Sequence, residues 1–147
     1  MLKVIYDKKN KGGPYGKGGW CGFYSLTNKT LLDFSEYKYL CFWVKGRAEG
    51  VDFKVGIADA VWKKKDDAVK SLEPVSKYVD AGKITTEWQK ACVPLSDFPD
   101  IDFKQIASLS FGFETGLYTY DKNSAGAKPR GTVYFDDIKF YRERPEY

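Results

Sequence analysis

The sequence predicts an all-β fold, an antiparallel β-sandwich, from three observations. Apolar and polar residues alternate in short runs, which is the period-2 pattern of half-buried strands. Phe, Trp and Tyr make up 17% of the 147 residues, and aromatic residues are enriched in strands. No segment has the period of a long helix. About seven short strands separated by turns fit one sandwich domain that spans residues 1–147.

The first two predicted strands flank a Gly-rich, basic loop. Residues 2–7, LKVIYD, form the first, and residues 20–27, WCGFYSLT, form the second. Alternation along the second strand puts Trp20, Gly22 and Tyr24 on one face. The two rings therefore share a face across a glycine.

The third strand, residues 39–46, has the strongest pattern. Leu40, Phe42 and Val44 form its predicted core face. Trp43 lies on the opposite face.

The rest of the chain alternates strands with long connections. Residues 52–60 and 87–94 continue the period-2 pattern, whereas residues 61–86 form a long excursion with one short strand predicted near 75–79. A strand around Leu109, Phe111 and Phe113 leads into a second long polar loop, and residues 131–141 close the domain.

The closing strand, GTVYFDDIKFY, contains two adjacent carboxylates. Three residues separate Phe135 from Ile138, so the side-chain alternation slips by one position. Either the strand bulges at Asp136–Asp137, or Asp136 lies on the inward row with its carboxylate at the edge of the core.

Charge and composition exclude several function classes. The 24 basic and 20 acidic residues are spread along the chain, and a net charge of +4 is too mild to indicate a nucleic acid or an anionic membrane as partner. The chain has no histidine, which removes the usual zinc sites and histidine-based catalysis. No apolar run reaches membrane length. No signal peptide precedes the fold, so an exported protein is expected here in mature or trimmed form.

The three cysteines, Cys21, Cys41 and Cys92, lie in apolar contexts without CxxC spacing. Such residues are predicted to be small buried hydrophobes. Cys41 and Cys92 could still pair if their strands are neighbours, which leaves the compartment open.

Two motifs carry a family resemblance, WQKACVPLSDF and VYFDDIKF. With the order of the strands, they resemble bacterial jelly-roll domains of the galactose-binding-like fold, over residues 2–141. Many such domains are carbohydrate-binding modules attached to or encoded near glycoside hydrolases. The resemblance implies a non-catalytic module that binds a polysaccharide or oligosaccharide, outside the cell or at its surface, in glycan degradation.

The resemblance also implies an open sheet edge and a metal. In the family a further strand usually precedes the element that residues 2–7 resemble, so we expect a partner chain, a neighbouring domain or residues 61–86 to cover that edge. Related domains commonly hold a structural calcium through the first acid of the closing motif. This makes Asp136 a ligand and Asp137 a neighbour or second ligand. The alternative is an acid that bonds loop amides or faces Lys139 or Arg142.

The aromatic residues carry the binding hypothesis, because sugar C–H faces stack on rings while polar side chains bond the hydroxyls. Trp43 is predicted to stand beside a row of small residues that forms a shallow groove, and packing beneath a loop is its alternative role. The small residues are Gly56, Ala58, Ser110 and Gly112. The predicted carbohydrate-binding residues are Trp20, Tyr24, Trp43, Trp62, Tyr118 and Tyr120.

Two other functions compete with this hypothesis. In a structural or protein-interaction module, the same aromatic residues serve packing. A small hydrolase needs two carboxylates that face one cleft, and Glu114 is the only strand carboxylate suited to that role.

Overall fold

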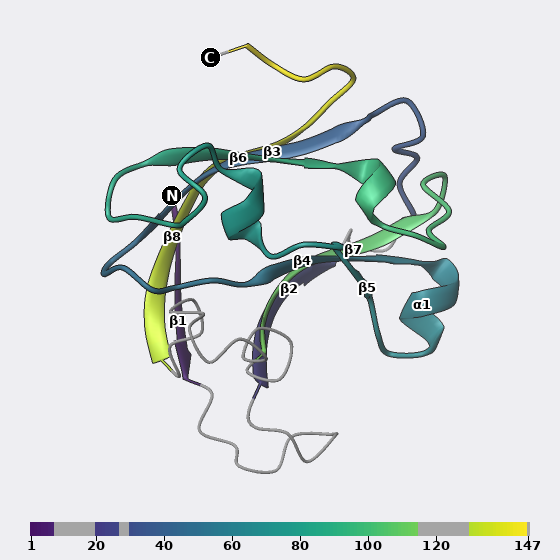
Figure 1. The fold of residues 1–147 in the computed structure, drawn as a ribbon. Coiled ribbons are helices and arrows are strands. Elements are labelled where there is room, and N and C mark those ends of the chain that lie inside the picture. Colours follow the sequence, from purple (N-terminus) through teal and green to yellow (C-terminus); the bar gives the residue numbers. More distant parts are fainter. Residues whose placement is uncertain (8–19, 27–29, 115–129, 147) are drawn as a thin grey trace.

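The computed structural model describes residues 1–7, 20–26, 30–114 and 130–146, which form two antiparallel sheets packed face to face (Figure 1). This confirms the predicted sandwich. The strands are β1 (Leu2–Asp7), β2 (Trp20–Leu26), β3 (Tyr39–Gly46), β4 (Lys54–Asp59), β5 (Val69–Lys70), β6 (Gln89–Pro94), β7 (Ile106–Glu114) and β8 (Arg130–Tyr141). Sheet I has the order β1-β8-β3-β6, and sheet II has the order β2-β7-β4-β5.

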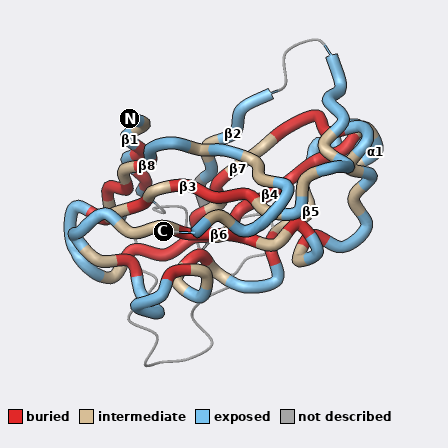
Figure 2. Tube along the Cα trace, turned by 90° about the horizontal axis from the view of Figure 1, so that it is seen from above, coloured by how far each residue is buried: buried red, intermediate tan, exposed pale blue. Residues whose placement is uncertain are grey.

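Aromatic rings from both sheets fill the space between them. Buried residues lie along most of the strands, whereas much of the connecting chain is exposed (Figure 2). Phe111 of sheet II stacks on Phe135 of sheet I, with ring centroids 4.2 Å apart and an angle of 15° between the rings. Phe42 and Phe53 each approach Phe111 at 5.6 Å. The predicted core face of β3, which includes Phe42, is fully buried.

A β-bulge interrupts strand β8 at the two carboxylates. Cys41 of β3 pairs with Lys139, whereas Trp43 pairs with Asp136, so β8 advances three residues while β3 advances two. Asp137 adopts a left-handed backbone with φ of 51°. The bulge places both Phe135 and Ile138 against the core, which confirms the first of the two interpretations of this strand.

The excursion at residues 61–86 contains little regular structure. A short helix, α1 (Ala60–Lys64), opens it after Asp59, whose side chain accepts the Trp62 N–H and caps the helix. Strand β5 follows.

The prediction of a strand near residues 75–79 is wrong, because a 3₁₀ helix, η1 (Val75–Tyr78), occupies this position. Val75 and Val79 are both buried. Positions four apart share a face in a strand and nearly do so in a helix, so their spacing could not decide between the two.

One of the three segments expected to cover the edge at β1 lies elsewhere. Strands β1 and β6 are the edges of sheet I, and no described element of residues 61–86 pairs with β1. This excursion instead supplies β5, an edge of sheet II. Cover of β1 by a partner chain or a domain stays a prediction.

A second 3₁₀ helix, η2 (Leu95–Asp97), follows β6. Among the described residues, no helix is long and apolar enough to cross a membrane.

Candidate functional site

The outer face of sheet II has a floor of small side chains, which we call the Tyr24 face. Tyr24 of β2 pairs with Ser110 of β7, Ser110 pairs with Gly56 of β4, and Gly56 pairs with Lys70 of β5. These four residues form one row across the whole sheet. The neighbouring outward positions are Gly22, Leu26, Lys54, Ala58, Ser108 and Gly112.

The middle of this row is closely packed. Gly56 is buried, and a Cβ atom added there would clash with Ser110 Oγ and lie against Ala68. Adjacent strands lie about 4.8 Å apart, so three spacings put roughly 14 Å between the backbones of Tyr24 and Lys70. The row therefore has a large side chain at each end, an accessible stretch from Tyr24 to Ser110, and a covered glycine between Ser110 and Lys70.

The two ends of the row differ in chemistry. The Tyr24 side chain is 66% exposed, so its ring is open to a ligand. Lys70 is half-buried, and desolvation lowers the pKa of its ammonium group, against the opposing effect of Asp67. Lys54 is the outward residue two positions before Gly56 on β4, and its ammonium group donates to the Leu72 carbonyl at 3.3 Å. The face thus combines a stacking ring, a hydroxyl and ammonium donors.

Trp20 occupies the same strand face as Tyr24 by backbone alternation and pairs with Glu114. The side chains of Trp20 and Glu114 lie outside the described residues, as do Tyr118 and Tyr120. Their roles stay predictions.

The prediction of a groove between Trp43 and the row of small residues is wrong. Trp43 lies on the outer face of sheet I, whereas the small residues, from Gly56 to Gly112, lie on sheet II. The cause is that β3 pairs with β6 and β8, not with β4 or β7. The Lys90 ammonium also lies 5.1 Å from the centroid of the Trp43 ring, and the Lys90 side chain is only 7% exposed. This cation occupies a position that a stacked sugar would need.

Trp62 lies on α1 rather than on a strand, so it is not part of the row. Its indole N–H donates to the Asp100 carbonyl at 3.3 Å, and the Lys65 ammonium lies 4.6 Å from the ring centroid. Asp59 accepts the Asp102 N–H at 2.9 Å and holds the same loop. Trp62 therefore anchors this loop, and the structure separates it from the predicted platform.

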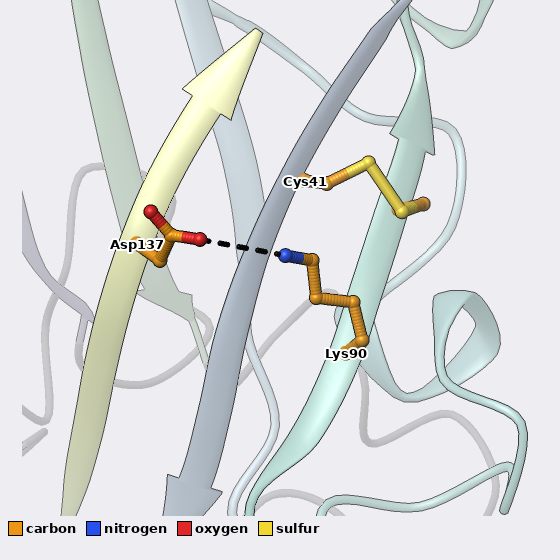
Figure 3. The surroundings of a disulfide bond; sticks show 4 residues. Cys41, Lys90 and Asp137 are labelled. Atoms are coloured by element: carbon orange, nitrogen blue, oxygen red, sulfur yellow. Dashed lines mark ion pairs between the residues drawn. A yellow bond between two sulfur atoms is a disulfide. The ribbon is translucent and has the colours of Figure 1, made fainter. Parts of the chain in front are cut away.

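The carboxylates of the bulge have ammonium neighbours. Asp137 pairs with Lys139 at 2.9 Å. It also pairs with Lys90 at 3.8 Å (Figure 3). The hydrogen bond from Lys139 lowers the pKa of Asp137. Asp136 accepts the Asp137 N–H and lies 3.7 Å from the N-terminal ammonium of Met1. Pairing with Lys139 was one alternative for these acids, whereas Arg142 pairs with Glu36.

Among the described residues, the surroundings of Asp137 supply ammonium groups rather than further oxygen ligands for a calcium ion. Two ammonium groups already neutralise Asp137, and no group of three or more metal-binding acids or cysteines occurs among the described residues.

Calcium at Asp136 therefore stays a prediction, and a chelator tests it. If the ion is bound, removing it should lower the melting temperature, because a ligand specific to the native state stabilises that state. An unchanged melting temperature, with no metal found by elemental analysis, would exclude the ion.

Cys41 and Cys92 form a disulfide between directly paired positions of β3 and β6, with their Cα atoms 4.2 Å apart (Figure 3). This decides a pairing that the sequence left open. Lys90 of β6 reaches over β3 toward Asp137 beside the disulfide. The outer face of sheet I is thus crosslinked by a covalent bond and an ion pair.

Comparison with protein families decides the wider identity. The model of carbohydrate binding domain 30 matches residues 2–142. The chain belongs to this family. No curated protein sequence matches it. Membership of the carbohydrate binding domain 30 family confirms the predicted carbohydrate-binding module, and sequence reasoning had reached that class through the motifs of β6 and β8.

Solved structures agree with the family. A crystal structure of a family 30 carbohydrate-binding module has a TM-score of 0.71 and 26% identity, over 99% of this chain and 69% of that one. The family 30 module of a cellulosomal cellulase of Clostridium thermocellum has a TM-score of 0.66 and 26% identity, over 95% and 72% of the chains.

A third structure shows the fold in a different family. The family 11 module from Clostridium thermocellum, in complex with a β-1,3-1,4-mixed-linked tetrasaccharide, has a TM-score of 0.64 and 15% identity, over 95% of this chain and 74% of that one.

Proposed function

We propose that the Tyr24 face binds one extended chain of a β-linked glucan, and that the module has no catalytic activity of its own. The row from Tyr24 through Ser110 and Gly56 to Lys70 carries this proposal. It offers a flat surface rather than an enclosed cavity. A flat surface suits a segment within a long polymer, because the chain can continue past both ends.

Each group in the row has a role toward a sugar. The exposed Tyr24 ring stacks on the C–H face of one sugar residue. Ser110 both donates to and accepts from a sugar hydroxyl, whereas the ammonium group of Lys70 donates only. The Ser110 hydroxyl and the Ala68 methyl group cover Gly56, so the glycan meets these side chains between the two ends of the row.

Three observations support the ligand class and the setting. The similar family 30 module belongs to a cellulosomal cellulase, and the family 11 module holds a mixed-linked β-glucan fragment. The disulfide between Cys41 and Cys92 favours an oxidising compartment, in which such bonds persist. We therefore place the module outside the cell, beside a polysaccharide-degrading enzyme.

Tyr24→Ala tests the face. Loss of the ring and its contact area should weaken binding of soluble mixed-linked β-glucan by about tenfold, the equivalent of ~1.4 kcal/mol. The melting temperature should stay nearly constant, because the Tyr24 side chain is largely exposed. Affinity electrophoresis and thermal unfolding measure the two effects.

Trp43→Ala is the matched aromatic control on sheet I. Its ring is half-buried and contacts the Lys90 ammonium, so we expect a lower melting temperature and an unchanged affinity. If Trp43→Ala lost affinity and Tyr24→Ala kept it, the glycan would bind sheet I rather than sheet II. Loss of affinity in neither variant would contradict both locations. The same incubations should release no reducing sugar if the module is non-catalytic.

A further inference from the structure

A hollow of about 270 Å³ lies between the β3–β4 connection and the start of β8. Arg47, Glu49 and Val51 line it from the connection, and Arg130 and Thr132 line it from β8. The Arg47 N–H donates to the Thr132 carbonyl at 3.0 Å, which fixes the connection against the strand. Thr132 and Val51 are buried, so the hollow has a firm base.

Two guanidinium groups line this hollow, and Asp7 of β1 is the cross-strand neighbour of Arg130. Arg47 and Arg130 are both exposed, and within the described part of the chain neither side chain has an ion pair or hydrogen bond. Glu49 is the one carboxylate in the lining, and it pairs with Lys83 at 3.7 Å. Arg142 elsewhere pairs with Glu36 at 2.7 Å, so the two arginines of the hollow differ in lacking such a partner.

A row of cations and rings continues from the hollow over the outer face of sheet I. Lys45 lies two residues before Arg47 in the chain, and its ammonium lies 4.9 Å from the Trp88 centroid and 5.5 Å from the Tyr134 centroid. Tyr134 pairs with Lys3 on its other side. The row therefore adds positive charge beside the two arginines.

We propose that this hollow is a second binding site, which takes the carboxylate of a uronic acid residue in an acidic polysaccharide. A guanidinium group donates two parallel hydrogen bonds to a carboxylate, and two such groups can share one anion. The volume is below the usual 300–1,000 Å³ of a drug-sized pocket, so one sugar residue is the matching size.

The hollow shares no lining residue with the Tyr24 face, because the β3–β4 connection and β8 line it and Tyr24 lies on β2 of sheet II. The proposal therefore does not depend on glucan binding. An acidic polysaccharide could bind at the hollow while a separate glucan chain binds at the Tyr24 face. A nucleic acid is a poorer match, because the positive charge of the whole chain is mild.

Calorimetric titration with trigalacturonic acid and with its methyl ester tests the proposal. The module should bind the acid and not the ester, and added salt should weaken binding because both arginines are exposed. The Arg47→Ala/Arg130→Ala variant should lose about tenfold or more in affinity, since hydrogen bonds between charged groups are involved. Its melting temperature should not change.

Three further proteins make the result decisive. Arg142→Ala removes an arginine that is already paired and should bind the acid like the wild type. Arg47→Lys/Arg130→Lys keeps the charge but loses the planar fork, so its affinity should fall between those of the wild type and the alanine variant. Tyr24→Ala should keep its affinity for the acid, which separates this site from the glucan face.

Four results would overturn the proposal. These are equal binding of acid and ester, no binding of the acid, wild-type affinity in the double alanine variant, or equal loss in Arg142→Ala. Equally tight binding of a single-stranded DNA oligonucleotide would show attraction by charge alone, and this too would contradict a uronate site.

Discussion

Phe111→Ala is expected to lower the free energy of unfolding by about 3–5 kcal/mol, the range for phenylalanine truncation in a core. Phe111 is 1% exposed and lies where the two sheets meet. Its ring stacks on Phe135 and meets the edges of Phe42 and Phe53. Truncation would leave a cavity lined by these three rings, which cannot all move inward to fill it.

Urea unfolding measures this loss, and Phe23→Ala is the matched control. Phe23 pairs directly with Phe111 on the neighbouring strand β2 but is only half-buried, so its truncation should cost clearly less. Equal losses in the two variants would mean that the centre of the core lies elsewhere. Binding of β-glucan by the folded fraction of Phe111→Ala should persist, because this ring points away from the Tyr24 face.

Removal of the disulfide is expected to have the second largest effect. Cys41 and Cys92 are 51 residues apart, and crosslinks that close loops of this order stabilise proteins by about 2–4 kcal/mol. The bond stabilises mainly by restricting the unfolded chain. The ladder between β3 and β6 should therefore survive in the Cys41→Ala/Cys92→Ala variant, with a lower unfolding midpoint.

A reductant provides the matching measurement. It should lower the unfolding midpoint of the wild type to near that of the double alanine variant, and it should not affect the variant. Cys21→Ala should respond to the reductant as the wild type does, because the pairing of Cys41 with Cys92 remains. A wild-type midpoint that is insensitive to the reductant would show that the bond does not form in solution.

The strands and their core faces could be predicted because alternation is a local property. Leu40, Phe42 and Val44 show the period-2 pattern within one strand, and burial follows from it. The bulge in β8 was foreseeable for the same reason, since it shows as a change of parity within a few residues. The 3₁₀ helix at Val75–Tyr78 was not, because its apolar spacing fits both structures.

The location of Trp43 could not be predicted by the same argument. Alternation shows that this ring lies opposite the core face of β3, but it does not show which sheet β3 joins. Sheet membership depends on pairing between strands that are distant in sequence. Tyr24 is exposed, as a ring that binds a ligand must be, and its role in carbohydrate binding stays a prediction.

Lys70 was missed because its strand has only two residues and lies in a segment with weak periodicity. Pairing with Gly56 is the observation that places it on the Tyr24 face. A short edge strand gives almost no local signal, so this part of the face becomes visible only in three dimensions.

The bulge in β8 also predicts how the length of this strand can vary among relatives. Deleting Asp137 would restore a uniform alternation, with Phe135, Ile138 and Phe140 all on the core face, and the ladder with β3 would become regular. Replacing Asp137 with asparagine or glycine should also be mild, since both residues tolerate its left-handed backbone. Natural variation at this position should therefore include both substitutions and the loss of one residue, which removes the bulge and keeps the core face.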